Sequence, residues 1–274
     1  MCELLGINSQ HRFDTTPLLA DFFKRGGQTA DHADGWGLAS FDRFDDLRIT
    51  KHESAAAACP HARTVLQQRQ LSDRLVAHIR KATFGDRLTE NTQPFRRSLW
   101  GRDWVFAHNG DLYDFYPASQ SQYTVLGQTD SERAFCLLFS TLLQKFDLFH
   151  PRLRTLLHFL KQQSDDIAHH GTFNYLLGNN QLLIAYASTE LYWTHIAQPH
   201  QAISLVDSRY VIPSLSGHHL NSTIIVATRP LTSSEPWYPM GKGEIRLFSR
   251  GQPLIDISCA RQHSQKWDTA EILV

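Results

Sequence analysis

Cysteine stands directly after the initiator methionine, so a chain that starts at Cys2 carries a thiol and a free α-amine on one residue. A small second residue permits removal of Met1, and an exposed α-amine has an ordinary pKa of about 7.7 to 8.0. Such an amine can take the proton of a thiol and make it nucleophilic. The position therefore predicts an N-terminal nucleophile. The alternative is a cysteine that packs as a small apolar side chain, which is the commoner use of a free cysteine.

The segment HIRKAT carries groups suited to binding a carboxylate. A predicted strand ends at Arg80, whose guanidinium can form paired hydrogen bonds with an α-carboxylate. Thr83 can add a hydroxyl group three residues later. The alternative for the same segment is a surface arginine with a threonine in the following turn.

The segment AHNGDL predicts a site for developing negative charge. A strand ends at His108 and leaves Asn109 and Gly110 in a turn. The amide NH2 of Asn109 and the backbone N–H of Gly110 can point at one spot, which is the donor pair of an oxyanion hole. Asn-Gly is also the commonest two-residue hairpin signal, so a purely structural interpretation stays open.

The segment GQTDSE places Asp130 at the entrance of a long predicted helix. Its carboxylate can pair with the ammonium group of an amino acid. The alternative is helix capping, because Thr129 and Glu132 already have the spacing of a capping box.

Taken in chain order, these residues resemble the class II (Ntn-type) glutamine amidotransferases. The segments that carry the resemblance are RGG with DGWG, HIRKAT, NTQPF, HNG and TD, and they run from Cys2 to Asp130 in the family's order. The resemblance implies that the thiol of Cys2 attacks the side-chain amide of glutamine while its α-amine serves as base. It also implies an oxyanion hole made by Asn109 and Gly110, ammonia release, and hydrolysis of a γ-glutamyl thioester.

The resemblance also assigns the residues around the substrate. Arg80 is expected to hold the α-carboxylate with help from Thr83, and Asp130 is expected to hold the α-ammonium. Arg25 of the RGG segment is expected to line the surroundings of the nucleophile. The chain departs from many relatives at Gln93, where they have a histidine, so Gln93 supplies no titratable group and is expected to influence the substrate or the rate.

The elements that must position these groups alternate between strands and helices. Apolar residues at intervals of three and four predict a helix that starts at Thr129, and Pro151 is expected to open a second one. A first helix is expected after Thr15 or Thr16, and a short one near residues 60–70. Strands are predicted in CELLGI, WGLASF, LRITKH, RLVAHI, DWVFAH, FNYLLG, LLIAYAS, YWTHIA, TIIVATRPL, EIRLF and PLIDIS.

This order favours an α+β fold in which helices cover paired sheets, and the resemblance implies the four-layer αββα sandwich of the Ntn hydrolases. No linker or repeat divides the sequence, so a single domain is expected over residues 1–274. Residues 259–274 are expected to form an appended helix or a loose tail.

Composition excludes several other function classes. Lys plus Arg and Asp plus Glu both number 27, so the chain has no excess of positive charge for binding nucleic acid or a membrane surface. The start of the chain lacks the pattern of a signal peptide, and the apolar stretches are too short to span a bilayer. The four cysteines are too scattered for a metal site or a disulfide framework. A cytoplasmic protein is therefore expected.

The chain has 15 histidines, including the pairs His169/His170 and His218/His219, and histidine is a common metal ligand. No pair has helical metal-ligand spacing beside a carboxylate, so no metal is expected and most histidines are expected at the surface. No cofactor is expected either.

The expected activity is hydrolysis of glutamine to glutamate and ammonia, and transfer of the ammonia to an acceptor on a partner synthase is the expected physiological setting. One alternative is a hydrolase of γ-glutamyl peptides or other γ-glutamyl conjugates. A second alternative is a non-catalytic glutamine sensor that retains Arg80 and Asp130.

Overall fold

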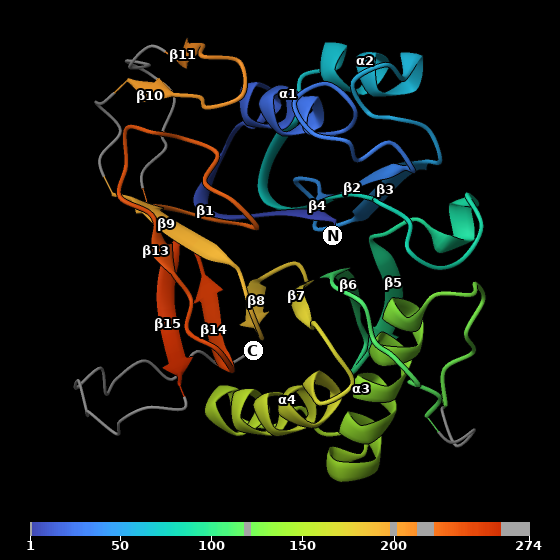
Figure 1. Ribbon diagram of the computed structural model, residues 1–274. Coiled ribbons are helices and arrows are strands. Elements are labelled where there is room, and N and C mark those ends of the chain that lie inside the picture. The colour runs from blue at the N-terminus through green and yellow to red at the C-terminus, as the bar shows by residue number, and fades with distance from the viewer. Residues whose placement is uncertain (1, 118–121, 198–201, 213–221, 259–274) are drawn as a thin grey trace.

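The computed structural model describes residues 2–117, 122–197, 202–212 and 222–258 (Figure 1). The predicted tail, residues 259–274, lies outside the described residues. Two antiparallel sheets form the centre of the molecule. The first has seven strands in the order β13-β9-β12-β1-β4-β2-β3 and the second has six in the order β15-β14-β8-β7-β6-β5.

The strands of the first sheet are β1 (Glu3–Asp14), β2 (Trp36–Phe41), β3 (Leu47–His52), β4 (Leu71–Ile79), β9 (Tyr192–Ile196), β12 (Thr223–Ala227) and β13 (Tyr238–Pro239). Those of the second sheet are β5 (Phe95–Leu99), β6 (Arg102–Asn109), β7 (Asn174–Gly178), β8 (Leu182–Ala187), β14 (Glu244–Ser249) and β15 (Gln252–Ile257). A separate pair is formed by β10 (Ile203–Ser204) and β11 (Val211–Ile212).

Helices cover the outer face of each sheet, as Figure 1 shows. The first sheet is covered by α1 (Thr16–Lys24) and α2 (Pro60–Gln67), and the second by α3 (Asp130–Phe146) and α4 (Leu153–Ala168). One 3₁₀ turn, η1, spans Thr89–Asn91. The order helix, sheet, sheet, helix confirms the predicted αββα sandwich.

Three apolar clusters correspond to the three interfaces between these layers. Leu19 and Phe22 of α1 pack with Ile79 of β4 under the first helix layer. Phe135 of α3 packs on Phe106 of β6 under the second, with ring centroids 4.9 Å apart. The cluster between the sheets consists mainly of small and branched side chains, among them Leu4, Ala39, Val76, Val105, Ala107, Leu176 and Ala185. Small side chains let the two sheets approach closely.

The predicted helix starts are close to those observed. Thr129 caps α3 by accepting a hydrogen bond from the backbone N–H of Glu132 at 3.2 Å. The carboxylate of Glu132 does not complete the box, because it accepts from the backbone N–H groups of Leu126 and Gly127 and pairs with Arg97. The prediction for the second helix was wrong at its start, since α4 begins at Leu153 and not at Pro151.

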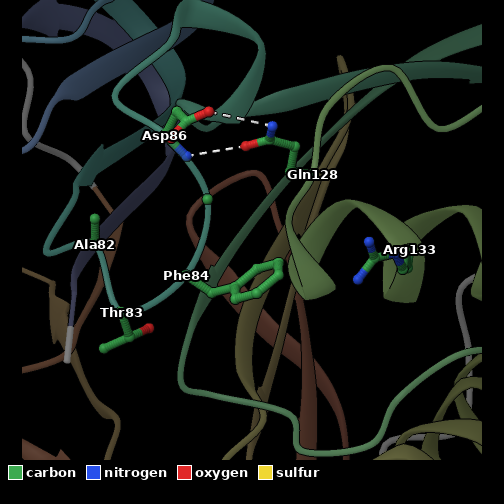
Figure 2. Close-up of a pocket in the computed structure, with 7 residues that line it drawn as sticks. Ala82, Thr83, Phe84, Asp86, Gln128 and Arg133 are labelled. Atoms are coloured by element: carbon green, nitrogen blue, oxygen red, sulfur yellow. Dashed lines mark hydrogen bonds between the residues drawn. The ribbon is translucent and has the colours of Figure 1, made fainter.

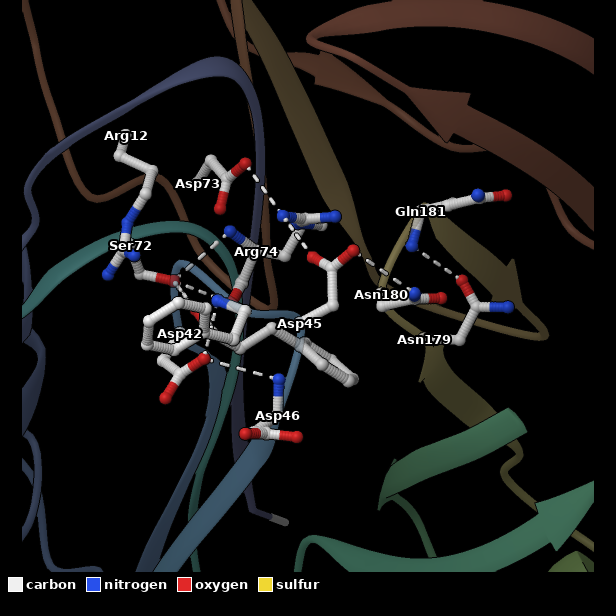
Figure 3. A network of polar contacts seen from close by, with 12 residues as sticks. Arg12, Asp42, Asp45, Asp46, Ser72, Asp73, Arg74, Asn179, Asn180 and Gln181 are labelled. Carbon is white, nitrogen blue, oxygen red and sulfur yellow. Dashed lines mark hydrogen bonds and ion pairs between the residues drawn. The ribbon is translucent and has the colours of Figure 1, made fainter. Parts of the chain in front are cut away.

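Polar contacts join the two sheets through the β2–β3 and β7–β8 turns (Figure 3). Arg74 of β4 pairs with Asp73 and with Asp45 of the β2–β3 turn, each at 2.9 Å. Asp45 also accepts from the amide of Asn180 in the β7–β8 turn at 3.5 Å. Deeper in the structure, Asn8 of β1 donates to the Gln181 carbonyl at 3.2 Å. The hydrogen bond from the buried Asn8 side chain fixes the relative position of the two sheets more strongly than the more exposed ion pairs of Arg74 can.

Three histidines, His32, His78 and His108, are buried and are exceptions to the expectation that most histidines lie at the surface. His78 lies on β4 on the side that faces the second sheet. Burial lowers the pKa of His78 to about 3, and the positive charges of His108 and Arg80 contribute to the decrease.

This burial predicts acid sensitivity. In the unfolded chain His78 takes up a proton near pH 6.5, whereas in the folded protein it stays neutral down to about pH 3. Burial of His78 therefore costs no stability above pH 6.5. As the pH falls from 6.5 toward 3, the free energy of unfolding decreases, by about 3 kcal/mol at pH 4. Urea unfolding at pH 4 and pH 7 measures this loss. His78→Leu should reduce it, whereas the matched variant His158→Leu, at an exposed position of α4, should not.

Candidate active site

The register between β1 and β4 fixes the position of Cys2. Glu3 is paired with Ile79, so the residue before β1 lies opposite the residues that follow β4. The Cys2 Sγ accepts from the Lys81 backbone N–H at 3.4 Å and lies 3.5 Å from the Lys81 carbonyl oxygen. The thiol is half-buried at this strand end.

The environment of Cys2 favours the neutral thiol. Burial raises the pKa of Cys2 to about 11, although the Lys81 backbone N–H and the charge of Arg80 oppose the increase. At neutral pH the sulfur therefore needs a base before it can act as a nucleophile.

Arg80 follows β4 and is buried, so the alternative of a surface arginine is wrong. Its guanidinium donates to the carbonyl oxygens of Phe84, Gly85 and Asp86 at 2.9 to 3.0 Å. The backbone of Arg80 is fixed as well, since its N–H donates to Gly35 of the DGWG segment at 2.8 Å. Arg80 thus holds residues 84–86 in a tight loop beside Cys2.

Thr83 and Asp34 attach the same loop to its neighbours. The Thr83 hydroxyl donates to the carboxylate of Asp111, directly after the Asn-Gly pair. Asp34 accepts from the Ala82 backbone N–H at 2.8 Å and pairs with Arg87. The loop after Arg80 is therefore connected both to the DGWG segment and to the end of β6.

Asn109 and Gly110 do not form a hairpin turn. After β6 the chain does not return as the next strand, and β6 pairs instead with β5 and with β7, which begins at Asn174. Position 110 needs a glycine because the backbone of Thr172 lies very close to it. A Cβ atom at this position would lie 1.9 Å from the Thr172 carbonyl oxygen. The hairpin interpretation is thus wrong, and the Asn-Gly segment is free to line a site.

The side chain of Asn109 is buried and contacts a residue that sequence reasoning missed. Its Nδ2 donates to Thr228 Oγ1 at 3.3 Å, and the same hydroxyl oxygen accepts from the Leu4 backbone N–H at 3.0 Å. The Oδ1 atom of Asn109 has no hydrogen-bond partner among the described residues. Thr228 therefore connects the start of β1, and hence Cys2, to Asn109.

Asp130 is the first residue of α3 and is half-buried. One carboxylate oxygen accepts from the Leu112 backbone N–H and the other from that of Ser131, both at 2.8 Å. Since Thr129 performs the capping, the carboxylate of Asp130 is not needed for that purpose. It ties the helix to the segment that follows Asn109 and Gly110.

Gln93 and Arg25 stabilise the surroundings of the site. Gln93 Oε1 accepts from the His108 backbone N–H at 2.6 Å, which supports the strand that ends at Asn109. Arg25 is buried and pairs with Glu3 at 3.1 Å and Asp207 at 2.8 Å. Glu3 is the residue that follows Cys2, so these ion pairs fix the guanidinium of Arg25 next to the start of β1.

A cavity of about 550 Å³ lies between the loop after Arg80 and the start of α3 (Figure 2). Gln128 closes one side by donating to the Asp86 carboxylate at 3.3 Å and accepting from the Asp86 backbone N–H at 2.9 Å. Phe84 and Arg133 face the cavity from opposite sides. The lining residues are Ala82, Thr83, Phe84, Gly85, Asp86, Gln128 and Arg133.

Within the described part of the chain, no three His, Cys, Asp or Glu side chains come together in a way that could hold a metal ion. None of the helices in that part combines the length and the apolar character needed to cross a membrane.

The contacts thus bring Cys2, the loop after Arg80, the Asn-Gly segment and Asp130 into one region. The sequence model of the class II glutamine amidotransferases matches residues 1–271. The chain belongs to this family.

Relatives support the same assignment. A putative glutamine amidotransferase of Escherichia coli, YafJ, is 34% identical over 256 residues, which cover 93% of this chain and all of the relative. A putative glutamine amidotransferase of Haemophilus influenzae is 34% identical over 261 residues, or 94% of this chain and 87% of the relative.

Solved structures agree with the fold. The crystal structure of a predicted glutamine amidotransferase from Pseudomonas aeruginosa has a TM-score of 0.69 at 28% identity, covering 93% of this chain and 100% of that one. Glutamine phosphoribosylpyrophosphate amidotransferase from Bacillus subtilis has a TM-score of 0.57 at 17% identity over 92% of this chain, which corresponds to 48% of that enzyme. The second similarity concerns the fold alone. This class II amidotransferase therefore has the Ntn-type sandwich.

Proposed function

We propose that this class II amidotransferase hydrolyses the γ-amide bond of glutamine with Cys2 as its nucleophile. The observation that carries the proposal is the linked set of contacts from Cys2 through Lys81, Thr83 and Asp111 to the Asn-Gly segment and Asp130. These segments come from distant parts of the sequence, and they bring a thiol, amide donors and a carboxylate together.

The reaction begins with removal of Met1, which frees the α-amine of Cys2. This amine takes the thiol proton, and Sγ attacks the γ-carbonyl carbon of glutamine. The resulting oxyanion is stabilised by the amide of Asn109 and the backbone N–H of Gly110. Collapse breaks the C–N bond, ammonia leaves with a proton from the α-ammonium, and water hydrolyses the thioester to glutamate and the free thiol.

The amide of Asn109 is suited to this role because one of its polar atoms is unused. Its contact with Thr228 is made to a hydroxyl, which can donate as well as accept. A half-turn of the amide would let Thr228 donate to Oδ1 and would free the NH2 group. Buried polar atoms without a partner are uncommon and often serve a function.

The zwitterionic end of glutamine fits the other side of the region. Asp130 supplies the negative charge for the α-ammonium. Positive charge for the α-carboxylate comes from Arg80, and the Thr83 hydroxyl adds a polar contact. Ammonia is released into solution or passed to an acceptor on a partner.

A second candidate is hydrolysis of larger γ-glutamyl compounds. Two exposed aromatic side chains at the cavity favour it. Phe84, which lines the cavity, is 58% exposed, and Tyr116, whose ring lies under the guanidinium of the lining residue Arg133, is 74% exposed. Exposed aromatic rings can pack against a leaving amine larger than ammonia.

The test is an assay of glutamate release from glutamine and from a panel of γ-glutamyl peptides, using protein shown by intact mass to begin at Cys2. Release from glutamine at the highest kcat/KM supports the proposal, and a clear preference for a peptide supports the second candidate. Tight glutamine binding without turnover would overturn both and favour a sensor.

Asp130→Asn should raise the KM for glutamine about tenfold to a hundredfold, because a hydrogen bond to a charged group is worth about 1.5 to 3 kcal/mol. Asparagine keeps an acceptor for the Leu112 N–H, so the fold should persist. Initial rates over a range of glutamine concentrations measure the change. Asp166→Asn, at an exposed position of α4, is the matched control and should leave KM unchanged. An unaltered KM in Asp130→Asn would remove the carboxylate from binding.

A further inference from the structure

Thr228 is a buried residue that contacts both the strand carrying the nucleophile and the proposed oxyanion hole. It follows β12, and its backbone N–H donates to the Leu4 carbonyl oxygen at 3.2 Å, while its Oγ1 accepts from the Leu4 backbone N–H at 3.0 Å. The next residue, Arg229, pairs with Glu3, which follows Cys2. Thr228 is therefore fixed beside Leu4, two residues after the nucleophile.

The hydroxyl of Thr228 and the amide of Asn109 each have an unused polar group. In the described part of the chain, Thr228 Oγ1 makes two hydrogen bonds, from the Leu4 N–H and from Asn109 Nδ2, and it accepts in both. A hydroxyl can accept two hydrogen bonds and donate one, so its own hydrogen remains to be donated. Asn109 Oδ1 in turn lacks a donor among the described residues. Thr228 is 4% and Asn109 1% exposed, and unpaired polar groups are costly at such burial.

A half-turn of the Asn109 amide pairs these two unused groups. Oδ1 then takes the place of Nδ2 and accepts the hydroxyl hydrogen of Thr228, and Nδ2 takes the place of Oδ1. The bond from the Leu4 N–H persists, because it uses the hydroxyl as an acceptor. Of the groups in this contact, only the amide N–H groups then lack a partner, and these are the donors that an oxyanion binds.

We propose that Thr228 is a positioning residue of the oxyanion hole, and that its hydroxyl donates to Asn109 Oδ1 and so turns the amide NH2 toward the substrate. This inference rests on the proposed function, because it takes Asn109 to be an oxyanion donor. Since Thr228 is fixed on the strand that begins next to Cys2, it sets the amide relative to the nucleophile before the reaction starts. Donors that are already in place need no rearrangement when charge develops.

Thr228→Val removes the hydroxyl and keeps the shape of the side chain. It should lower kcat for glutamine about tenfold to a hundredfold and keep KM within about threefold, because the amide acts mainly on the charge that develops during the reaction. Thr228→Ser should stay within about threefold of wild type, since serine also donates and accepts. In the Asn109→Ala variant, adding Thr228→Val should lower kcat by no more than about twofold, because no amide remains to be positioned. Steady-state kinetics measure all four variants.

The matched control is Thr223→Val. Thr223 is a buried threonine on β12, and its hydroxyl contacts the hydroxyl of Ser9 on β1 at 2.7 Å, at the end of the strand pair away from Cys2. Its loss should lower the thermal stability by an amount similar to that in Thr228→Val and leave kcat within about twofold of wild type. Equal decreases of kcat in the two valine variants, or additive decreases with Asn109→Ala, would overturn the inference.

Neutron diffraction from Met1-free crystals exchanged into heavy water separates failure of the inference from failure of the proposed function, because it needs no turnover. Deuterium on Thr228 Oγ1 directed at Asn109 Oδ1 supports the inference even if glutamine is not hydrolysed. Amide deuterium of Asn109 directed at Thr228 Oγ1 overturns the inference, and hydrolysis of glutamine by the same protein would leave the proposed function standing.

Discussion

Cys2→Ala should lower glutamine turnover by about 10⁴-fold or more, to the background of the assay, while glutamine binding is largely retained. The variant removes the only atom that forms a covalent bond with the substrate in the proposed reaction. The binding groups on the loop after Arg80 and on α3 are untouched. Glutamate release under saturating glutamine measures turnover, and calorimetry measures binding.

The matched control for this prediction is Cys59→Ala. Cys59 is also a free cysteine, but it is buried in the apolar cluster beneath α1 and α2. Its loss should leave kcat within about threefold of wild type, with at most a modest decrease in thermal stability. Full activity in Cys2→Ala, or equal losses in both variants, would contradict the assignment of Cys2.

Asn109→Ala should lower kcat about 100- to 1000-fold with little change in KM, which is the usual effect of removing one oxyanion-hole donor. The NH2 group matters mainly when charge develops on the γ-carbonyl oxygen, so ground-state binding should be nearly unaffected. Steady-state kinetics over a range of glutamine concentrations separate the two parameters.

Asn180→Ala is the corresponding control, because Asn180 lies in the β7–β8 turn, where it contacts Asp45. Its kinetics should match those of wild type. The oxyanion role would be refuted by a rise in KM alone in Asn109→Ala, since that pattern indicates lost ground-state binding.

Much of the architecture could be predicted from the sequence because the strands and helices are strongly patterned. WGLASF and LRITKH coincide with β2 and β3, and the helix that starts at Thr129 coincides with α3. The very short strands β10, β11 and β13 escaped prediction. They have two residues each and depend on pairing with distant partners, which no local pattern reports.

The candidate site was less predictable, because each local signal had a second explanation. The Asn-Gly pair suggested a hairpin as well as an oxyanion hole, and only the pairing of β6 with β7 shows that no hairpin forms there. Thr129 turned out to cap α3, which leaves the carboxylate of Asp130 for other contacts. Local sequence alone could not separate these possibilities.

Other residues were missed because their roles depend on the tertiary structure. Thr228 follows β12, whose register with β1 brings it next to Leu4, and its only sequence signal is a hydroxyl directly after an apolar strand. Asp111 becomes relevant through its contact with Thr83. The role of Gln93 is also visible only in three dimensions, because its amide oxygen accepts from the backbone N–H of His108.

The central claim is that the sulfur of Cys2 becomes acylated by the substrate. Rapid quenching of Met1-free protein during turnover of glutamine, followed by peptide mass analysis, tests it directly. The account predicts a mass increase equal to one glutamyl group on the peptide that begins with Cys2, absent in Cys2→Ala. Turnover without any such adduct, or an adduct on Cys59 or Cys136 instead, would contradict it.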